Sequence, residues 1–228
     1  MNSPPPSRPP RPVWLFDLDN TLHDASHAIF DAIDGRMTDY VQHALGIERA
    51  EANRLRTLYW RRYGATLLGL VRHHGIDAEH FLRETHDFGV AGMLRAERGL
   101  AHLFARLPGR KVLVTNAPRG YAGLVLRGLA LHRHVRGRYT IESMRVHGSF
   151  RPKPSRLMLS VLLAREGIRP SRAILVEDSL PNIRAARALG VRTVLITRHS
   201  RSGGIRHSRS AGMRIDSLHQ LLRRVPRH

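Results

Sequence analysis

Two carboxylates stand at the end of the first apolar run of this sequence. Asp17 and Asp19 are separated by one residue and follow directly on residues 13–16, which read Val-Trp-Leu-Phe. A short continuous apolar run is typical of a buried parallel strand, and in an open α/β sheet the chemistry takes place just beyond the carboxyl ends of such strands. Two carboxylates there repel each other and require a cation or a shared proton. Their oxygen atoms suit a hard divalent cation such as Mg2+.

Polar side chains also follow later apolar runs. One run ends at Thr115, which Asn116 follows, and another is followed directly by Glu177 and Asp178. Between these segments, Lys153 lies between two prolines, which hold it in an extended loop. Each group has an ordinary alternative, namely a turn residue, a solvated acidic loop or a surface cation. Because the carboxyl ends of parallel strands meet at one edge of a sheet, we expect these groups to gather there.

The elements that must position these groups alternate in type along the chain. Segments of helical periodicity, including 155–166 and the stretch from Pro181 to Gly190, separate the later apolar runs. This alternation is typical of a parallel α/β sheet with crossover helices. We predict a helix near 95–107 and strands at 13–16, 111–115, 173–176 and 191–196, with a weaker candidate strand at 138–141.

The gap between the first two predicted strands is too long for one crossover. From Asp24 to about Gly46, apolar residues recur at spacings of three and four, which predicts an amphipathic helix. Further helical segments end at Gly64 and Gly75, and Asp77 is suited to cap a fourth. The predicted parts are a disordered Pro/Arg-rich N-terminus (1–12), an α/β core (13–22 and 91–197), an inserted helical bundle (23–90) and a basic tail with a terminal helix (198–228).

The order and spacing of the polar groups resemble the four motifs of the haloacid dehalogenase (HAD) superfamily of phosphohydrolases. The resemblance begins with Asp-x-Asp-x-Thr directly after a strand and covers residues 13–197. It implies an α/β fold with a Rossmann-like parallel sheet, and it identifies the helical insertion as a C1-type cap that closes over the site. The dehalogenase branch lacks the second acid of the first motif, so the presence of Asp19 favours phosphoryl chemistry.

The same resemblance implies a role for each matching residue. Asp17 matches the nucleophile that forms an aspartyl-phosphate, and Asp19 matches the general acid and base. Thr115 and Asn116 match the segment that binds the phosphoryl group. Lys153 matches the cation that binds the phosphoryl oxygens and offsets their charge during the reaction.

A Mg2+ site is also implied by the resemblance. Its ligands would be Asp17, the backbone carbonyl of Asp19, Asp178 and, at longer range, Glu177. The cation would neutralise the repulsion between the nucleophile and a phosphate dianion. A phosphomutase shares this core but must protect its aspartyl-phosphate from water, and the sequence leaves that alternative open.

Finer features resemble the pyrimidine 5'-nucleotidase-like members of the superfamily. They are Asp-x-Asp-Asn-Thr-Leu from residue 17, Thr-Asn-Ala from residue 115 and the segment 59–64 of the cap. The substrate implied is a nucleoside monophosphate, with a sugar or cofactor phosphate as the alternative. Tyr59 and Tyr63 share a helix face and are candidates to stack on a base. His73 is a further candidate for substrate contact, and Trp60 is predicted to pack between cap helices.

Composition narrows the remaining possibilities. The formal net charge is +20, and few acidic residues follow Glu97, so the second half would attract phosphorylated metabolites and also nucleic acid without specificity. The non-enzymatic alternative is a basic nucleic-acid-binding module on the same fold. Aromatic residues make up only 6% of the chain and do not alternate with arginine, which argues against that alternative. The chain has no cysteine, no apolar run near the ~20 residues that span a bilayer, and no signal-peptide pattern, so a cytoplasmic location is expected.

Overall fold

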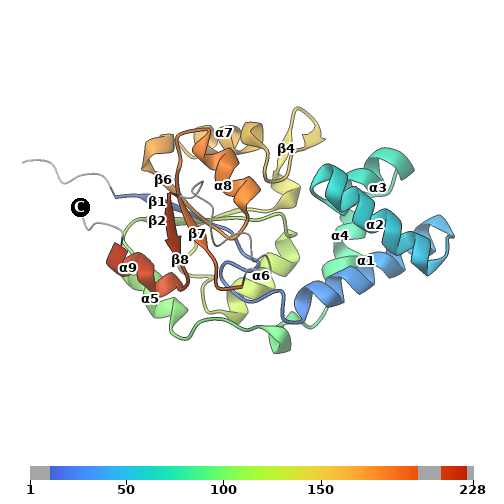
Figure 1. The fold of residues 1–228 in the computed structure, drawn as a ribbon, viewed down its shortest axis with the longest axis horizontal. Coiled ribbons are helices and arrows are strands. Elements are labelled where there is room, and N and C mark those ends of the chain that lie inside the picture. The colour runs from blue at the N-terminus through green and yellow to red at the C-terminus, as the bar shows by residue number, and fades with distance from the viewer. Residues whose placement is uncertain (1–10, 200–211, 225–228) are drawn as a thin grey trace, which may run out of the picture.

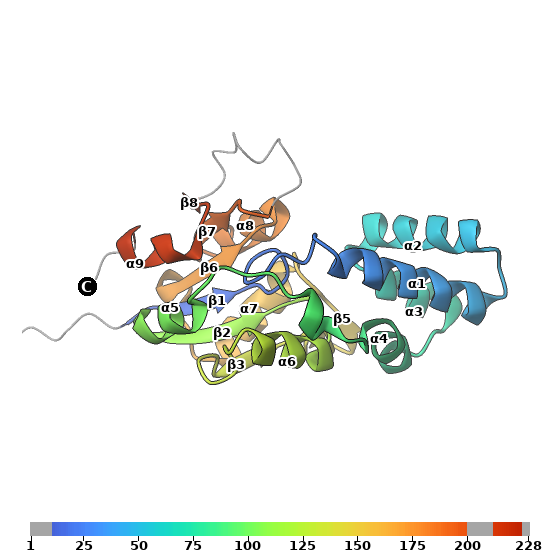
Figure 2. The ribbon, with the colours of Figure 1, turned by 90° about the horizontal axis from the view of Figure 1, so that it is seen from below.

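The computed structural model describes residues 11–199 and 212–224, which form an α/β core and a separate group of helices at one end of it (Figures 1 and 2). The predicted disordered N-terminus and the Ser/Gly/Arg-rich part of the predicted tail lie almost wholly outside these residues. Within the described ranges, no helix is long and apolar enough to cross a membrane.

A six-stranded parallel sheet forms the centre of the core, in the order β3-β2-β1-β6-β7-β8. The order reverses at β1, which lies between β2 and β6, and ligands of open α/β sheets bind at such a switch point. This arrangement confirms the predicted fold class. The strands are β1 (Val13–Phe16), β2 (Arg110–Val114), β3 (Gly137–Tyr139), β6 (Ala173–Glu177), β7 (Arg192–Ile196) and β8 (Met213–Ile215), and a separate antiparallel pair is formed by β4 (Arg145–Val146) and β5 (Ser149–Phe150).

Both faces of β1 are covered, which explains why its residues are all apolar. Trp14 and Phe16 belong to the apolar cluster on one face, and Leu15 belongs to the cluster on the other, each with no exposed surface. Helices α5 (Leu100–Arg106) and α6 (Arg119–Gly128) supply the first cluster, and α7 (Arg156–Arg165) and α8 (Leu180–Arg187) supply the second. Short 3-10 turns complete the core at η1 (Val90–Met93), η2 (Ile141–Ser143) and η3 (Pro170–Arg172).

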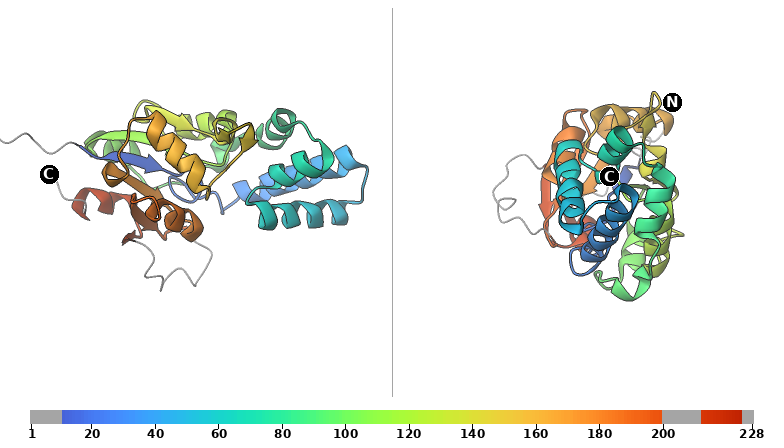
Figure 3. Two further views of the ribbon diagram at one scale, coloured as in Figure 1. Left: turned by 90° about the horizontal axis from the view of Figure 1, so that it is seen from above. Right: turned by 90° about the vertical axis from the view of Figure 1, so that its right-hand side faces the viewer.

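The inserted helices form the cap, which β1 points toward (Figure 3). They are α1 (Ile29–Leu45), α2 (Arg49–Tyr63), α3 (Thr66–His74) and α4 (Ala78–His86), packed around their own apolar cluster. The predicted helix ends are confirmed, because Gly46, Gly64 and Gly75 all adopt left-handed backbone conformations after α1, α2 and α3. The predicted cap of the fourth helix is also confirmed, since the Asp77 side chain accepts a hydrogen bond from the backbone N–H of His80 at 2.6 Å.

The last described segment differs from its prediction. Strand β8 pairs with β7 and extends the sheet, so these residues belong to the core and not to a tail. A 3-10 turn η5 (Leu218–Gln220) and a short helix α9 (Leu221–Arg224) follow, where a terminal helix was predicted. Leu218 and Leu221 are fully buried, and the carboxylate of Glu97 accepts a hydrogen bond from the Leu218 N–H at 2.8 Å.

Candidate active site

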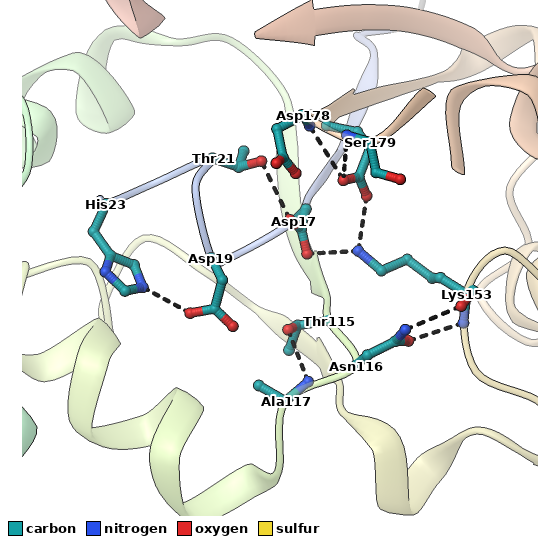
Figure 4. A network of polar contacts seen from close by, with 11 residues as sticks. Asp17, Asp19, Thr21, His23, Thr115, Asn116, Ala117, Lys153, Asp178 and Ser179 are labelled. Atoms are coloured by element: carbon teal, nitrogen blue, oxygen red, sulfur yellow. Dashed lines mark hydrogen bonds and ion pairs between the residues drawn. The ribbon is translucent and has the colours of Figure 1, made fainter. Parts of the chain in front are cut away.

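The loop after β1 forms a tight turn that places two aspartates beside each other. The backbone N–H of Asp17 donates to the carbonyl of Val176 at 3.1 Å, which continues the pairing with β6 for one residue. Asn20 has a positive φ of 59°, a conformation that asparagine tolerates better than most residues. Its side chain is fixed by two hydrogen bonds with Ser26, at 2.8 and 3.1 Å. The turn therefore directs Asp17 and Asp19 into the same space (Figure 4).

Lys153 joins two carboxylates from different strands. Its Nζ donates to Oδ1 of Asp17 at 2.5 Å and to Oε2 of Glu177 at 2.8 Å, and the residue is only 8% exposed. Burial lowers the pKa of Lys153, but the two carboxylates raise it by more, so that it lies above its ordinary value. The buried lysine is therefore charged.

The side chain of Asn116 fixes the backbone of Lys153 through two hydrogen bonds. Its amide nitrogen donates to the carbonyl of Lys153 at 3.0 Å, and its amide oxygen accepts from the N–H of Lys153 at 2.8 Å. Both ends of the Asn116 side chain are thereby engaged, which makes it a positioning group for the lysine. The sequence predicted Asn116 as a phosphate ligand, and its backbone N–H and the second N–H of its amide nitrogen are the donors that this pairing leaves for that purpose.

Thr115 lies directly after β2 and is 1% exposed. Its hydroxyl oxygen accepts a hydrogen bond from the N–H of Ala117 at 3.0 Å, so the hydroxyl hydrogen remains to be donated elsewhere. Figure 4 shows this hydroxyl on the same side of the site as Asp17 and Asp19. A hydroxyl donor in that place suits an anionic oxygen.

Three carboxylates offer oxygen atoms that lie within 4.8 Å of one another, from Asp17, Glu177 and Asp178. Burial and then the charge of Glu177 raise the pKa of Asp17 to about 7 and that of Asp178 to about 9. One lysine does not balance this much buried negative charge. The donor set is therefore the one that a hard divalent cation takes, and the site fits Mg2+ on chemical grounds.

Glu177 is distinguished from its two neighbours by its hydrogen bonds. Its Oε1 accepts from the backbone N–H groups of Asp178 and Ser179, each at 3.1 Å, and its Oε2 accepts from Lys153. Burial raises the pKa of Glu177, but Lys153, the side chain of Asp178 and the backbone N–H of Ser179 lower it below the ordinary value. Glu177 thus accepts three hydrogen bonds, whereas Asp17 accepts two, from Lys153 and from the Thr21 hydroxyl at 3.2 Å. Asp17 and Asp178 are therefore less fully engaged than Glu177 and better placed to bind a metal ion.

Asp19 has two partners that the sequence analysis did not identify. Its Oδ1 accepts a hydrogen bond from the hydroxyl of Tyr121 at 2.7 Å and lies 2.9 Å from Nε2 of His23. Burial raises the pKa of Asp19, but the contacts with His23 and Tyr121 lower it below its usual value. A histidine four residues after an aspartate is a detectable signal in a tight turn, whereas nothing in the sequence connects Tyr121 with Asp19.

The cap contacts Tyr121 through His86 at the end of α4. The imidazole lies edge-on to the ring of Tyr121, with centroids 5.8 Å apart, and its Nδ1 lies 2.8 Å from the Thr85 hydroxyl. Burial lowers the pKa of His86 to about 4, against the opposing attraction of Asp19. His86 is therefore neutral at the boundary between the cap and the core.

A cavity of about 520 Å3 lies between the core and the cap, and all the predicted core site residues line it. From the cap, its walls include the carboxylates of Asp31 and Asp34, the guanidinium of Arg56, the hydroxyl of Thr57 and the ring of Trp60. Arg56 donates to Oδ1 of Asp34 at 2.7 Å. The cap also contributes apolar side chains such as Phe30 and Leu67, so its side of the cavity is mixed in polarity and carries both signs of charge.

The predicted cap contacts are arranged differently from expectation. Tyr59 and Tyr63 bond His74 and His73 at 2.7 and 2.6 Å, and none of these four residues lines the cavity. The ring of Tyr59 lies so close to Gly69 that an added Cβ would come within 2.1 Å of it. These aromatic groups hold α2 against α3.

The prediction for Trp60 is wrong, because its side chain faces the cavity and not the interior of the cap. It was predicted to pack between cap helices, yet it is 59% exposed and lines the cavity. The helical period explains the difference, because Trp60 lies one residue beyond Tyr59 and is rotated by about 100° around α2. Among the described residues that line the cavity, Trp60 is therefore the one with an exposed aromatic ring.

Comparison with known proteins is consistent with this geometry. Residues 13–190 match the haloacid dehalogenase-like hydrolase family. The sequence is 28% identical over 235 residues to phosphoglycolate phosphatase 1 of Pseudomonas aeruginosa, covering 95% of this chain and 80% of that protein. The fold resembles an HAD phosphatase from Thermococcus onnurineus, with a TM-score of 0.64, 21% identity and coverage of 93% of this chain and 96% of that one. CbbY from Rhodobacter sphaeroides in complex with phosphate gives a TM-score of 0.62, with 21% identity and coverage of 92% and 96%. At these identities the two structures bear on the fold alone.

Proposed function

Because the chain belongs to the haloacid dehalogenase-like hydrolase family, we propose that it is a Mg2+-dependent phosphomonoesterase that acts through an aspartyl-phosphate. One observation carries the proposal. Lys153 bonds Asp17 and Glu177 at the sheet edge, where Asp178 and Asp19 also lie. A site with a charged lysine among carboxylates is suited to an anion bound together with a cation.

The proposed reaction has two steps. An oxygen of Asp17 attacks the phosphorus atom, the bond from phosphorus to the ester oxygen breaks, and Asp19 gives a proton to the departing oxygen. A water molecule then attacks the phosphorus of the aspartyl-phosphate and gives a proton to Asp19. Inorganic phosphate leaves, and Asp17 returns to its carboxylate form.

Asp19 has to be protonated for the first step and ionised for the second. Its lowered pKa keeps it ionised in the free protein, which is the form that accepts a proton from water. A phosphate dianion bound beside it would favour its protonated form, because nearby negative charge raises the pKa of a carboxyl group. His23 and Tyr121 hold one oxygen of Asp19 in both forms.

The oxygens of Asp17 and Asp178 would hold Mg2+, which supplies positive charge that offsets the repulsion between the nucleophile and the phosphate dianion. Lys153 would bind the oxygens of the phosphoryl group, and its charge would stabilise the transition state. The Thr115 hydroxyl would donate to another of these oxygens. Asn116 would keep Lys153 in place through its backbone.

We propose that the substrate is a small hydrophilic phosphate ester, with 2-phosphoglycolate the first to test. The relatives named phosphoglycolate phosphatases support this class. On the mixed cap wall, Arg56 and the two carboxylates would suit the polar groups of such an ester. A nucleoside monophosphate is the less supported substrate, since Tyr59 and Tyr63 bond histidines of the cap.

A screen of phosphate release tests the proposal. Purified protein is incubated with 2-phosphoglycolate, sugar phosphates, UMP and CMP, each with Mg2+ and with a chelator, and Asp17→Asn serves as the inactive control. We expect Mg2+-dependent release that is fastest for a small ester. Faster turnover of UMP or CMP than of every small ester would refute the substrate class and keep the phosphatase. Isomerisation of a sugar phosphate without net phosphate release would identify a mutase.

A further inference from the structure

A second cavity of about 520 Å3 lies at the opposite edge of the sheet from the active site. Its walls come from the residues at or just before the amino ends of β1, β2, β3 and β6, which is the end of the core away from the cap (Figure 2). The amino ends of parallel strands meet at one edge just as their carboxyl ends do. The cationic side chains that line it are Arg11, Arg110, Lys111, Arg133, Arg136 and Arg172.

The walls of this basic cavity contain no acidic residue among the described residues that form them. Arg110 donates to Oε2 of Glu166 at 2.6 Å, and Glu166 lies outside the lining. Within the described part of the chain, no ion pair joins Arg133 or Arg136 to a carboxylate. The charge gathered in the cavity is therefore largely uncompensated.

The surroundings of Lys111 and Arg172 are unfavourable for positive charge in the absence of an anion. Lys111 is half-buried, and its Nζ donates to the backbone carbonyl of Leu107 rather than to an acid. Burial and then the charge of Arg136 lower the pKa of Lys111. The Nε atom of Arg172 is buried and has no hydrogen-bond partner in the described structure. Like charges held together with an unused donor favour the binding of an anion.

We propose that the basic cavity is a binding site for a small, multiply charged phosphate anion, such as a di- or triphosphate chain. Guanidinium groups present planar pairs of N–H donors that match phosphate oxygens. The volume lies within the range of about 300–1,000 Å3 that is usual for small-molecule sites. Of the two aromatic rings in the lining, that of Phe104 is fully buried and that of His134 is a small imidazole, so recognition would rest mainly on the phosphates.

The basic cavity lies away from the active site, so an anion bound there would not take part in catalysis. The strands of the sheet separate it from Asp17 and Lys153, which lie at their carboxyl ends. A bound anion would bridge the starts of four strands and stabilise the core. We therefore expect it to raise the melting temperature without competing with substrate.

The test measures the binding of inorganic tripolyphosphate to the full chain by calorimetry, in the wild-type protein and in Lys153→Met, which lacks the cation of the active site. The variant Arg133→Ala/Arg136→Ala removes two exposed charges from the cavity. The control Arg156→Ala/Arg192→Ala removes two exposed arginines elsewhere on the core, so that both proteins lose the same net charge. We expect affinity to fall at least tenfold in the cavity variant and less than twofold in the control, with kcat and KM unchanged in both.

Three results would overturn the proposal. Equal losses in both variants would mean that net charge alone attracts the anion. Complete loss of binding in Lys153→Met, with the cavity arginines intact, would assign the anion to the active site. Tighter binding of a single-stranded oligonucleotide than of tripolyphosphate, lost in the cavity variant alone, would make this edge a nucleic-acid surface instead.

Discussion

The hydroxyl of Tyr121 donates a hydrogen bond to Oδ1 of Asp19 at 2.7 Å, although the two residues are 102 positions apart in the sequence. Nε2 of His23 lies 2.9 Å from the same oxygen. Within the described structure, no hydrogen bond reaches the other carboxylate oxygen, Oδ2. Two partners on one oxygen fix the carboxyl group in one orientation and leave Oδ2 for proton transfer.

The first prediction removes one of these partners. Tyr121→Phe keeps the ring that packs in the core and deletes the hydroxyl. We expect kcat for an alkyl phosphate to fall about tenfold, since a hydrogen bond to a charged group contributes roughly 1.5–3 kcal/mol and His23 still holds Asp19. Hydrolysis of p-nitrophenyl phosphate should fall much less, because its leaving group needs no proton. Equal losses for both esters would mean that Tyr121 acts on the fold and not through Asp19.

The second prediction concerns Asn116, whose side chain bonds both backbone groups of Lys153. Asn116→Ala should lower kcat/KM by about 10- to 100-fold, because the lysine is no longer held in place. In a Lys153→Met background the same change should cost almost nothing more, since residues that act through one group are not additive. Kinetics of the two single variants and the double variant measure this coupling. A full additional loss in the double variant would mean that Asn116 contacts the substrate directly.

The third prediction separates the two kinds of charge at the sheet edge. Asp178→Asn removes an oxygen ligand of the proposed metal site and should raise the Mg2+ concentration needed for half-maximal activity. Lys153→Met should lower kcat/KM by ~100-fold or more and leave the Mg2+ requirement nearly unchanged, because its charge serves the phosphoryl group. Titrations of activity with Mg2+ compare the two proteins. A similar shift in both would contradict the separate roles.

The sequence was sufficient to predict the groups at the strand ends. Asp17, Thr115 and Glu177 lie at the end of buried apolar runs, so the position of each strand determines the position of the side chain. Lys153 follows the short strand β5 instead, and it was predicted from its place between two prolines and from its order in the motifs. The cap helices were predictable for a related reason, since Gly46, Gly64 and Gly75 end helices in a conformation that glycine adopts freely.

Other features depend on contacts that a local pattern does not record. Tyr121 reaches Asp19 only because α6 packs beside the loop after β1. Strand β8 has three residues with an arginine in the middle, which is too short for a recognisable period. The choice between Tyr59 and Trp60 depends on which face of α2 turns toward the core, and a helix with few apolar residues leaves that face undefined.

The fourth prediction concerns the pH dependence of stability. The pKa of His86 is about 4 in the folded protein and 6.5 ordinarily, so the unfolded chain binds a proton between these values more readily than the folded chain does. The contribution of neutral His86 to the free energy of unfolding is therefore complete above about pH 6.5 and is lost as the pH falls toward 4. At pH 5 the loss from this group should be about 2 kcal/mol. Urea unfolding of wild type and His86→Asn at pH 7.5 and pH 5 tests this, because asparagine retains a partner for Thr85 and has no charge to gain. Parallel losses in the two proteins would show that His86 does not titrate as described.

The last prediction assigns Trp60 to recognition of the leaving group. The ring is 59% exposed and lines the active-site cavity from the cap, so it is available to an ester that extends beyond its phosphate. Trp60→Ala should lower kcat/KM for the best ester of the screen roughly fivefold, corresponding to about 1 kcal/mol of lost apolar contact. Acetyl phosphate, which extends little beyond its phosphoryl group, should be hydrolysed at an unchanged rate. Leu58→Ala is the matched control, because Leu58 is 50% exposed on the same helix and lies outside the cavity lining. If Leu58→Ala and Trp60→Ala affect the ester alike, the effect comes from the stability of α2, and the leaving group is recognised elsewhere.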